Sequence, residues 1–440
     1  MINVRTLLLA SAFVLATPFA AQPVMAMNAT DTALDYTKID DVAKALSTGQ
    51  FTELHSHLNS KMAGAVSADQ LKTLWEQITA QVGPLRKTEV KSPELAILHF
   101  EKAKLRLLLG NDASGQISGL LIQPDEDAAK VDPVPTVTAA DPITEQPIEF
   151  NAPNAPKLVG TLTLPKNVKN PPAVVLIHGS GAHDRYETIF TNRPFLDISR
   201  GLAKQGIAVL SYDKRTLTDA KTIDITKLTL DQETTDDGAA AAKFLQTNKN
   251  VNGKRVFVLG HSQGGMVIPL ILQRDAQIRG GIIFASPAGH LIDVLPHQNR
   301  TMLGDAVNTY AGKAHLKMID DSIRTIRDPK ADPKAIVLGQ PVSYWKSIDA
   351  VNPALNAKQT KQPMLVVQGG KDFQVIKQDW EGWEKHAKTK ATPLTFKLYP
   401  ELNHLGMKSL GKPGMEDYKD PRHVDPQLIS DIAAWIKAQR

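Results

Sequence analysis

The sequence contains no cysteine. Without thiols the chain can form neither disulfides nor thiolate metal sites, and it lacks both a cysteine nucleophile and a cysteine for N-terminal lipid attachment. With 28 glycines and 28 prolines in 440 residues, it is also too poor in both for a collagen or a low-complexity chain. The net charge is only +5. Such a weak charge over this length gives no reason to expect a nucleic-acid partner.

Long hydrophobic runs are missing as well. A membrane-spanning helix needs about 20 predominantly apolar residues in a row, and the sequence has no run of that length. The nearest candidate is the N-terminus, where Arg5 precedes an apolar segment over residues 7–16. Pro18 ends that segment early, and small Ala26 offers a cleavage point. This pattern is typical of a secretory signal peptide over residues 1–26. We therefore expect cleavage after Ala26, an exported protein that is periplasmic or secreted, and no stable membrane insertion.

Residues 28–124 are predicted to form a small α+β domain. Ser67 and Gln70 have the spacing of a capping box, which predicts a helix from residue 68 to about residue 82. Strand-like segments follow at residues 95–100, 104–109 and 116–122. Helices followed by an antiparallel sheet make a plausible small domain. The polar, proline-bearing residues 125–141 are predicted to be a linker.

From about residue 142 the pattern alternates between strands and helices. Short runs rich in Val and Ile predict strands at 161–164, 173–177, 207–211, 256–259, 281–284, 364–367 and 394–398. Amphipathic stretches predict helices at 195–205, 231–246, 263–273, 377–388 and 426–438. This alternation indicates an α/β fold with a mostly parallel sheet flanked by helices, over residues 142–440. Residues 290–360 interrupt the alternation and are predicted to be a helical cap.

A candidate nucleophile lies in the motif Gly260-His261-Ser262-Gln263-Gly264, which follows a predicted strand and precedes a predicted helix. In a G-x-S-x-G motif the glycines permit a tight turn that raises the serine hydroxyl clear of the sheet. No lysine follows the glycines, which excludes a phosphate-binding P-loop. We therefore expect Ser262 to be the nucleophile.

A serine nucleophile needs a base and an acid that orients the base. Asp372 and His404 each follow a predicted strand, in the order Ser, Asp, His that this topology requires. Asp293 and His423 are the competing acid and base. We expect Ser262, Asp372 and His404 to form a triad, with His404 as the base and Asp372 as its orienting acid.

An oxyanion hole needs two backbone N–H groups. One is expected from Gln263 at the start of the helix that follows the nucleophile. The other is expected from Ser180, in the sequence His-Gly-Ser-Gly after the strand at 173–177.

Taken together, these motifs resemble those of the α/β-hydrolase superfamily, and in particular of its exported bacterial serine esterases with a small N-terminal domain of unknown function. The resemblance covers residues 142–440 and rests on the motifs at residues 178–187, 212–216, 260–265, 369–375 and 403–404. It implies hydrolysis of carboxylic esters by Ser262, Asp372 and His404. Gln263 departs from the pattern, because family members usually have an apolar residue there.

Three weaker features allow two interpretations each. Charged residues at 184–187 and 213–215 form either an ion-pair network that braces the oxyanion loop, which we favour, or a site for a substrate carboxylate. His55 and His57 have no third ligand nearby, so we expect solvated side chains and no metal. Five cap residues either line an acyl pocket or form the core of the cap: Met302, Tyr310, Met318, Tyr344 and Trp345.

The leading hypothesis is an exported carboxylesterase that acts on small to medium acyl esters, with no cofactor and no metal. A peptidase or amidase, or an acyltransferase, on the same triad is the alternative among enzymes. The alternative outside enzymes is a binding protein on a hydrolase fold. The sequence specifies no oligomeric state.

Overall fold

The computed structural model describes residues 34–112, 114–124, 132–218, 223–224, 226–308, 310–387, 394–412 and 414–439. The predicted signal peptide and residues 125–131 of the predicted linker lie outside these ranges. The chain divides into two compact units, one of residues 1–130 with 305–318 and one of residues 131–304 with 319–440. Part of the predicted cap, residues 305–318, thus belongs to the first unit.

The first unit combines helices with an antiparallel sheet of order β1-β2-β3-β4. The helices are α2 (Ile39–Thr48), α3 (Phe51–Ser56), α4 (Ser60–Ala65) and α5 (Ala68–Val82), and the strands are β1 (Leu85–Ser92), β2 (Leu95–Phe100), β3 (Lys104–Asn111) and β4 (Ile117–Pro124). The capping box of Ser67 and Gln70 is present at the start of α5. Strand β1 was not predicted, because its side chains are exposed or half-buried and most are charged or polar.

The second unit contains a sheet whose order within the described residues is β14-β13-β10-β9-β7-β8-β6-β5. Its strands are β5 (Ile143–Phe150), β6 (Leu158–Pro165), β7 (Ala173–Ile177), β8 (Ala208–Tyr212), β9 (Val256–His261), β10 (Gly280–Phe284), β13 (Met364–Gly369) and β14 (Leu394–Tyr399). The pairs from β14 to β8 are parallel, whereas β6 pairs antiparallel with both β8 and β5. The prediction of a mostly parallel sheet is confirmed.

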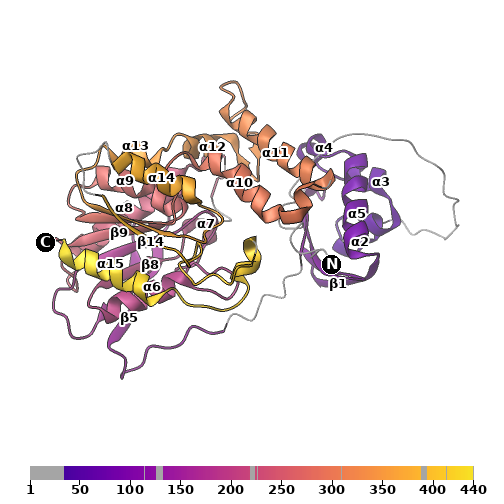
Figure 1. Ribbon diagram of the computed structural model, residues 1–440. Helices are drawn as coiled ribbons and strands as arrows, with labels where there is room; N and C mark the ends of the chain where they lie inside the picture. Colours follow the sequence, from indigo (N-terminus) through magenta and orange to yellow (C-terminus); the bar gives the residue numbers. More distant parts are fainter. Residues whose placement is uncertain are drawn as a thin grey trace. The chain divides into compact units, whose positions relative to one another are not determined.

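Helices cover both faces of this sheet (Figure 1). One face carries α8 (Asp236–Thr247) and α9 (Gln263–Arg274), and the other carries α6 (Pro194–Lys204) and α15 (Pro426–Ala438). All residues of β7, β8, β9 and β10 are buried, as expected for strands covered on both faces. A short π-helix, η1 (Asp231–Thr235), leads directly into α8.

The insertion between β10 and β13 is mostly helical. It comprises α10 (Leu291–Leu303), η2 (Gly304–Asn308), α11 (Tyr310–Arg327), the short strands β11 (Ile336–Val337) and β12 (Gln340–Pro341), α12 (Val342–Asp349) and α13 (Pro353–Ala357). After β13 the chain forms α14 (Lys377–Ala387), and η3 (Gly414–Tyr418) precedes α15.

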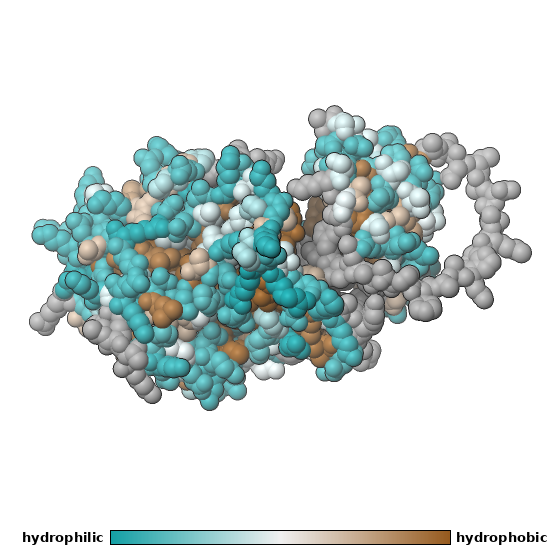
Figure 2. All heavy atoms as spheres, turned by 90° about the horizontal axis from the view of Figure 1, so that it is seen from above, coloured by the Kyte–Doolittle hydropathy of each residue, from teal (hydrophilic) through white to brown (hydrophobic). Residues whose placement is uncertain are grey.

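Polar side chains dominate the face of the molecule that is seen in Figure 2. Hydrophobic residues on this face lie in scattered areas. Scattered apolar side chains are ordinary on a protein surface. Among the described residues, no helix has the length and apolar character needed to cross a membrane.

Helix α9 approaches the end of β7 at Gly264. A Cβ atom at this position would lie 2.2 Å from the carbonyl oxygen of Ile177 and 2.5 Å from that of His178. Backbone atoms cannot rotate away as a side chain can. The glycine is therefore required for α9 to begin so close to the sheet.

We predict that Gly264→Ala lowers the free energy of unfolding by about 1–3 kcal/mol or more, because the added methyl group must displace backbone atoms. Gly289→Ala is the matched control, since a Cβ there meets no atom within 4 Å. Its effect should stay within about 0.5 kcal/mol. Urea denaturation of both variants checks this, and equal stability of the two would contradict the prediction.

Candidate active site

Ser262 occupies a sharp turn between β9 and α9. Its backbone has φ 53° and ψ −119°, a conformation that L residues rarely adopt. The backbone N–H of Ser262 donates to the carbonyl of Phe284 at 2.9 Å, which ties the turn to β10. Strain of this kind at a strand-to-helix turn is the signature of a nucleophile elbow.

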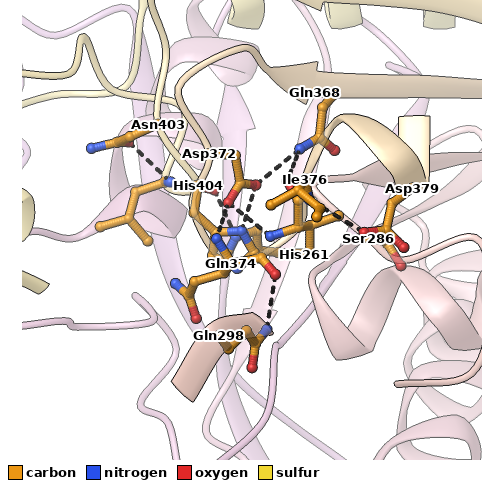
Figure 3. A network of polar contacts seen from close by, with 12 residues as sticks. His261, Ser286, Gln298, Gln368, Asp372, Gln374, Ile376, Asp379, Asn403 and His404 are labelled. Atoms are coloured by element: carbon orange, nitrogen blue, oxygen red, sulfur yellow. Dashed lines mark hydrogen bonds and ion pairs between the residues drawn. The ribbon is translucent and has the colours of Figure 1, made fainter. Parts of the chain in front are cut away.

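Asp372 and His404 lie in contact, although β14 separates them in sequence. Nδ1 of His404 is 2.7 Å from Oδ2 of Asp372, and both side chains are almost fully buried. Figure 3 shows the carboxylate surrounded by donors. The backbone N–H groups of Gln374 and Val375 donate to Oδ1 at 2.8 and 3.0 Å, and the Gln368 amide donates to Oδ2 at 3.0 Å. With Nδ1 facing the acid, Nε2 of His404 is the nitrogen left to accept a proton.

The competing acid and base lie elsewhere. Asp293 is in the first turn of α10, where its exposed carboxylate pairs with Arg327 at 2.9 Å. The side chain of His423 is 90% exposed and contacts Asp197. Neither residue therefore competes with Asp372 and His404 for a place beside Ser262.

His261, the residue before the nucleophile, connects three loops. Its Nδ1 lies 3.0 Å from Oε2 of Glu187, and its Nε2 donates to the carbonyl oxygen of His404 at 3.0 Å. Its ring centroid is 4.6 Å from that of His404. This contact places the base loop beside the elbow. The sequence motif assigns no role to His261, because its partner Glu187 is distant in the chain.

The pKa values of this buried pair move in opposite directions. Burial alone would lower the pKa of His261, but the Glu187 carboxylate and the His404 carbonyl raise it above the usual value. Burial alone would raise the pKa of Glu187, but His261 lowers it from 4.5 to about 2. The geometry and both directions indicate an ion pair.

The predicted oxyanion loop follows β7. The backbone N–H of Gly179 donates to Oε1 of Glu187 at 2.6 Å, and its carbonyl accepts from Nζ of Lys214 at 2.9 Å. A Cβ on Gly179 would lie 3.3 Å from that of Ser262, so this backbone runs beside the nucleophile. Ser180 comes next in the chain. Its N–H has no hydrogen-bond partner among the described residues.

Gln263 begins α9, so its backbone N–H is one of the helix N-terminal donors without a partner in the helix. Its side chain is buried and donates to Oε2 of Glu233 at 3.3 Å. The polar side chain thus belongs to a network inside the protein.

Three of the charged residues at the strand ends form ion pairs, either with one another or with residues of η1 and α8. Arg185 binds Asp213 through Nε at 3.0 Å, and Lys214 contacts Oε1 of Glu233 at 2.9 Å. A third pair, Arg215 with Asp237, is also buried. Lys214 also donates to the carbonyl of Gly179, so its pair with Glu233 braces the oxyanion loop, and the interpretation as an ion-pair network is confirmed. Arg215 donates to the carbonyls of Pro153 and Asn154 and does not contact that loop.

The remaining sequence candidates have structural contacts of their own. His57 stacks on Tyr36 at a ring distance of 4.1 Å, so it is not merely solvated. No group of metal-ligating side chains occurs within the described part of the chain. In the cap, the hydroxyl of Tyr344 donates to Glu233, and the indole of Trp345 donates to the carbonyl of Val337 at 2.6 Å. Both are packed against the core of the second unit.

We predict that the double variant Glu187→Gln/His261→Gln changes the acid sensitivity of the fold. Between pH 4.5 and about 2 the unfolded state binds a proton at Glu187 that the native state does not, so stability falls as pH falls. The double variant should lack this part of the slope, and because it removes both partners it leaves no unpaired charge buried. Urea denaturation from about pH 5 to 3 measures it, with Glu149→Gln, at an exposed carboxylate, as the control variant. Equal slopes for the double variant and the wild type would contradict the assignment.

The chain is similar to a known protein family and to a known esterase. Residues 169–408 match the family described as serine aminopeptidase, S33. The chain is 31% identical to esterase EstD of Thermotoga maritima over 402 residues, which cover 89% of this chain and 92% of the relative.

Among solved structures, Est1E from Butyrivibrio proteoclasticus aligns over 66% of this chain and 99% of its own, at 17% identity and a TM-score of 0.44. An esterase of Pyrococcus furiosus aligns over 70% and 95%, at 16% identity and a TM-score of 0.44. With the family model spanning more than half of the chain, and a relative matched along almost its whole length, this protein belongs to the serine aminopeptidase S33 family of α/β-hydrolases and is a serine hydrolase.

Proposed function

We propose that the protein is a serine carboxylesterase that hydrolyses small to medium acyl esters through an acyl intermediate on Ser262. The observation that carries the proposal is the 2.7 Å contact between buried Asp372 and His404, held beside the strained turn of Ser262. A base that is oriented by an acid next to a raised serine is the arrangement that acyl transfer requires.

The reaction proceeds in two halves. Nε2 of His404 takes the proton of Ser262 as Oγ attacks the ester carbonyl, and the backbone N–H groups of Gln263 and Ser180 stabilise the oxyanion. The C–O bond then breaks, the alcohol leaves with the proton from His404, and the acyl group stays on Ser262. Water, activated by His404, attacks the acyl group and releases the acid. Asp372 keeps Nδ1 of His404 protonated throughout.

Aminopeptidase activity is the second candidate, because the matched family is described as a serine aminopeptidase family. An aminopeptidase needs an acidic group to bind the free amine of its substrate. Glu187 and Glu233 lie next to the oxyanion loop, and both are buried in ion pairs with His261 and Lys214. The relative EstD is named an esterase. We therefore rank ester hydrolysis first.

We predict that the protein hydrolyses p-nitrophenyl esters, with the highest kcat/KM for the shorter acyl chains between acetyl and palmitoyl. Ser262→Ala should lose at least about 1,000-fold in kcat, because the nucleophile is gone. Ser114→Ala, an exposed serine of the first unit, serves as the control and should match the wild type. Full activity in Ser262→Ala, or amides cleaved as fast as esters, would contradict the proposal.

Export is proposed on the N-terminal sequence. When the full chain is expressed in a Gram-negative host, we expect activity in the periplasm or the medium and a mature N-terminus at Met27. A variant that starts at Met27 should stay in the cytoplasm. An uncleaved, cytoplasmic full-length chain would contradict the proposal.

A further inference from the structure

A buried lysine, Lys214, contacts the oxyanion loop but takes no part in the catalytic steps. The side chain of Lys214 is only 1% exposed, and it directly follows β8 and Asp213 in the chain. Nζ lies 2.9 Å from the carbonyl oxygen of Gly179 and 2.9 Å from Oε1 of Glu233. A buried charge is costly unless it is paired and hydrogen-bonded, so this position needs a specific reason for lysine.

The geometry of one peptide bond supplies that reason. The carbonyl of Gly179 and the N–H of Ser180 belong to the same planar, trans peptide group, so they point in opposite directions. When Lys214 holds the carbonyl on one side, the N–H is directed to the other. Gly179 itself lies beside Ser262, with 3.3 Å between their Cβ positions. Rotation of this peptide about its flanking bonds would turn the N–H away from the oxyanion.

The preceding peptide is fixed by a charge of the opposite sign. Oε1 of Glu187 accepts from the N–H of Gly179 at 2.6 Å. One carboxylate and one ammonium thus hold the two sides of Gly179. A glycine has no side chain to restrict rotation of its backbone, so these two charged contacts supply the restriction.

Glu233 connects Lys214 to the rest of the hole. Its other oxygen, Oε2, accepts from the side-chain amide of Gln263, whose backbone N–H is the second expected donor. The same oxygen accepts from the hydroxyl of Tyr344 in cap helix α12. Burial and the nearby Glu233 carboxylate raise the pKa of Tyr344, so its hydroxyl remains a donor. One carboxylate therefore contacts Gln263 of the oxyanion hole, Lys214 behind the Gly179–Ser180 peptide, and Tyr344 of the cap.

We propose that Lys214 is a positioning residue for the oxyanion hole, which sets the orientation of the Gly179–Ser180 peptide and is itself held by Glu233. This inference rests on the proposed serine mechanism at Ser262. Lys214 touches neither substrate nor nucleophile in this account. Its effect passes entirely through the backbone of the loop.

Lys214→Met tests the proposal, because it removes the ammonium and keeps an unbranched side chain. We expect kcat/KM for p-nitrophenyl acetate to fall about 100-fold, as for loss of one oxyanion donor, with KM changed by less than about threefold. The rate at which a fluorophosphonate labels Ser262 should fall in parallel, because its phosphoryl oxygen occupies the same hole. Labelling requires no ester turnover. If the wild type is labelled but hydrolyses no ester, the proposed function is contradicted. The role of Lys214 is then still tested by the labelling rates of the variants.

Two further variants separate positioning from simple loss of stability. Lys214→Met leaves the Glu233 carboxylate buried without its cation, so the double variant Lys214→Met/Glu233→Gln should recover thermal stability while its labelling rate stays low. Arg215→Met is the matched control. It removes a neighbouring buried cation that pairs with Asp237 and binds the carbonyls of Pro153 and Asn154. It should lower stability without lowering the labelling rate per folded molecule.

The outcomes decide the proposal directly. Slow labelling in both the single and the double Lys214 variants, with normal labelling in Arg215→Met, supports it. Labelling within about threefold of wild type in Lys214→Met overturns it, and so does a double variant that regains the rate together with stability. If Lys214→Met fails to fold, the double variant carries the test.

Discussion

The site depends on the buried ion pair between Glu187 and His261. Glu187 comes from the oxyanion loop, His261 precedes the nucleophile, and the other nitrogen of His261 holds the carbonyl of His404. Three loops from three strands are thereby fixed to one another through two side chains. Such a pair stabilises only when both partners remain, since removal of one leaves an uncompensated buried charge. The position of the base relative to Ser262 follows from this constraint.

A second buried pair, Lys214 with Glu233, lies behind the same loop. The backbone at this point must present N–H groups to an oxyanion, and glycine there offers little resistance to rotation. The side chains of Lys214 and Glu187 hydrogen-bond to this backbone and restrict its rotation. Preorganised donors of this kind need no rearrangement when negative charge develops. These two buried ion pairs thus lie where the orientation of the backbone matters for chemistry.

Local sequence patterns predicted the fold and singled out the catalytic candidates. The runs of Val and Ile marked the buried strands, and Ser262, Asp372 and His404 stood out because each follows one of them. The exposed strand β1 and the edge strand β5 were missed, because they are polar and lack a clear apolar pattern. The pairings of Glu187 and of Glu233 were also missed as specific contacts. Their partners are distant in sequence, and only the folded sheet brings them together.

The most direct test of the account is to identify the residue that carries the acyl group. The enzyme would be mixed with p-nitrophenyl acetate, quenched in acid within the first turnover, and digested for peptide mass spectrometry. The account predicts an acetyl group on Ser262. Ester turnover with the acetyl group on another residue, or with no acyl-enzyme on Ser262 at any quench time, would contradict it.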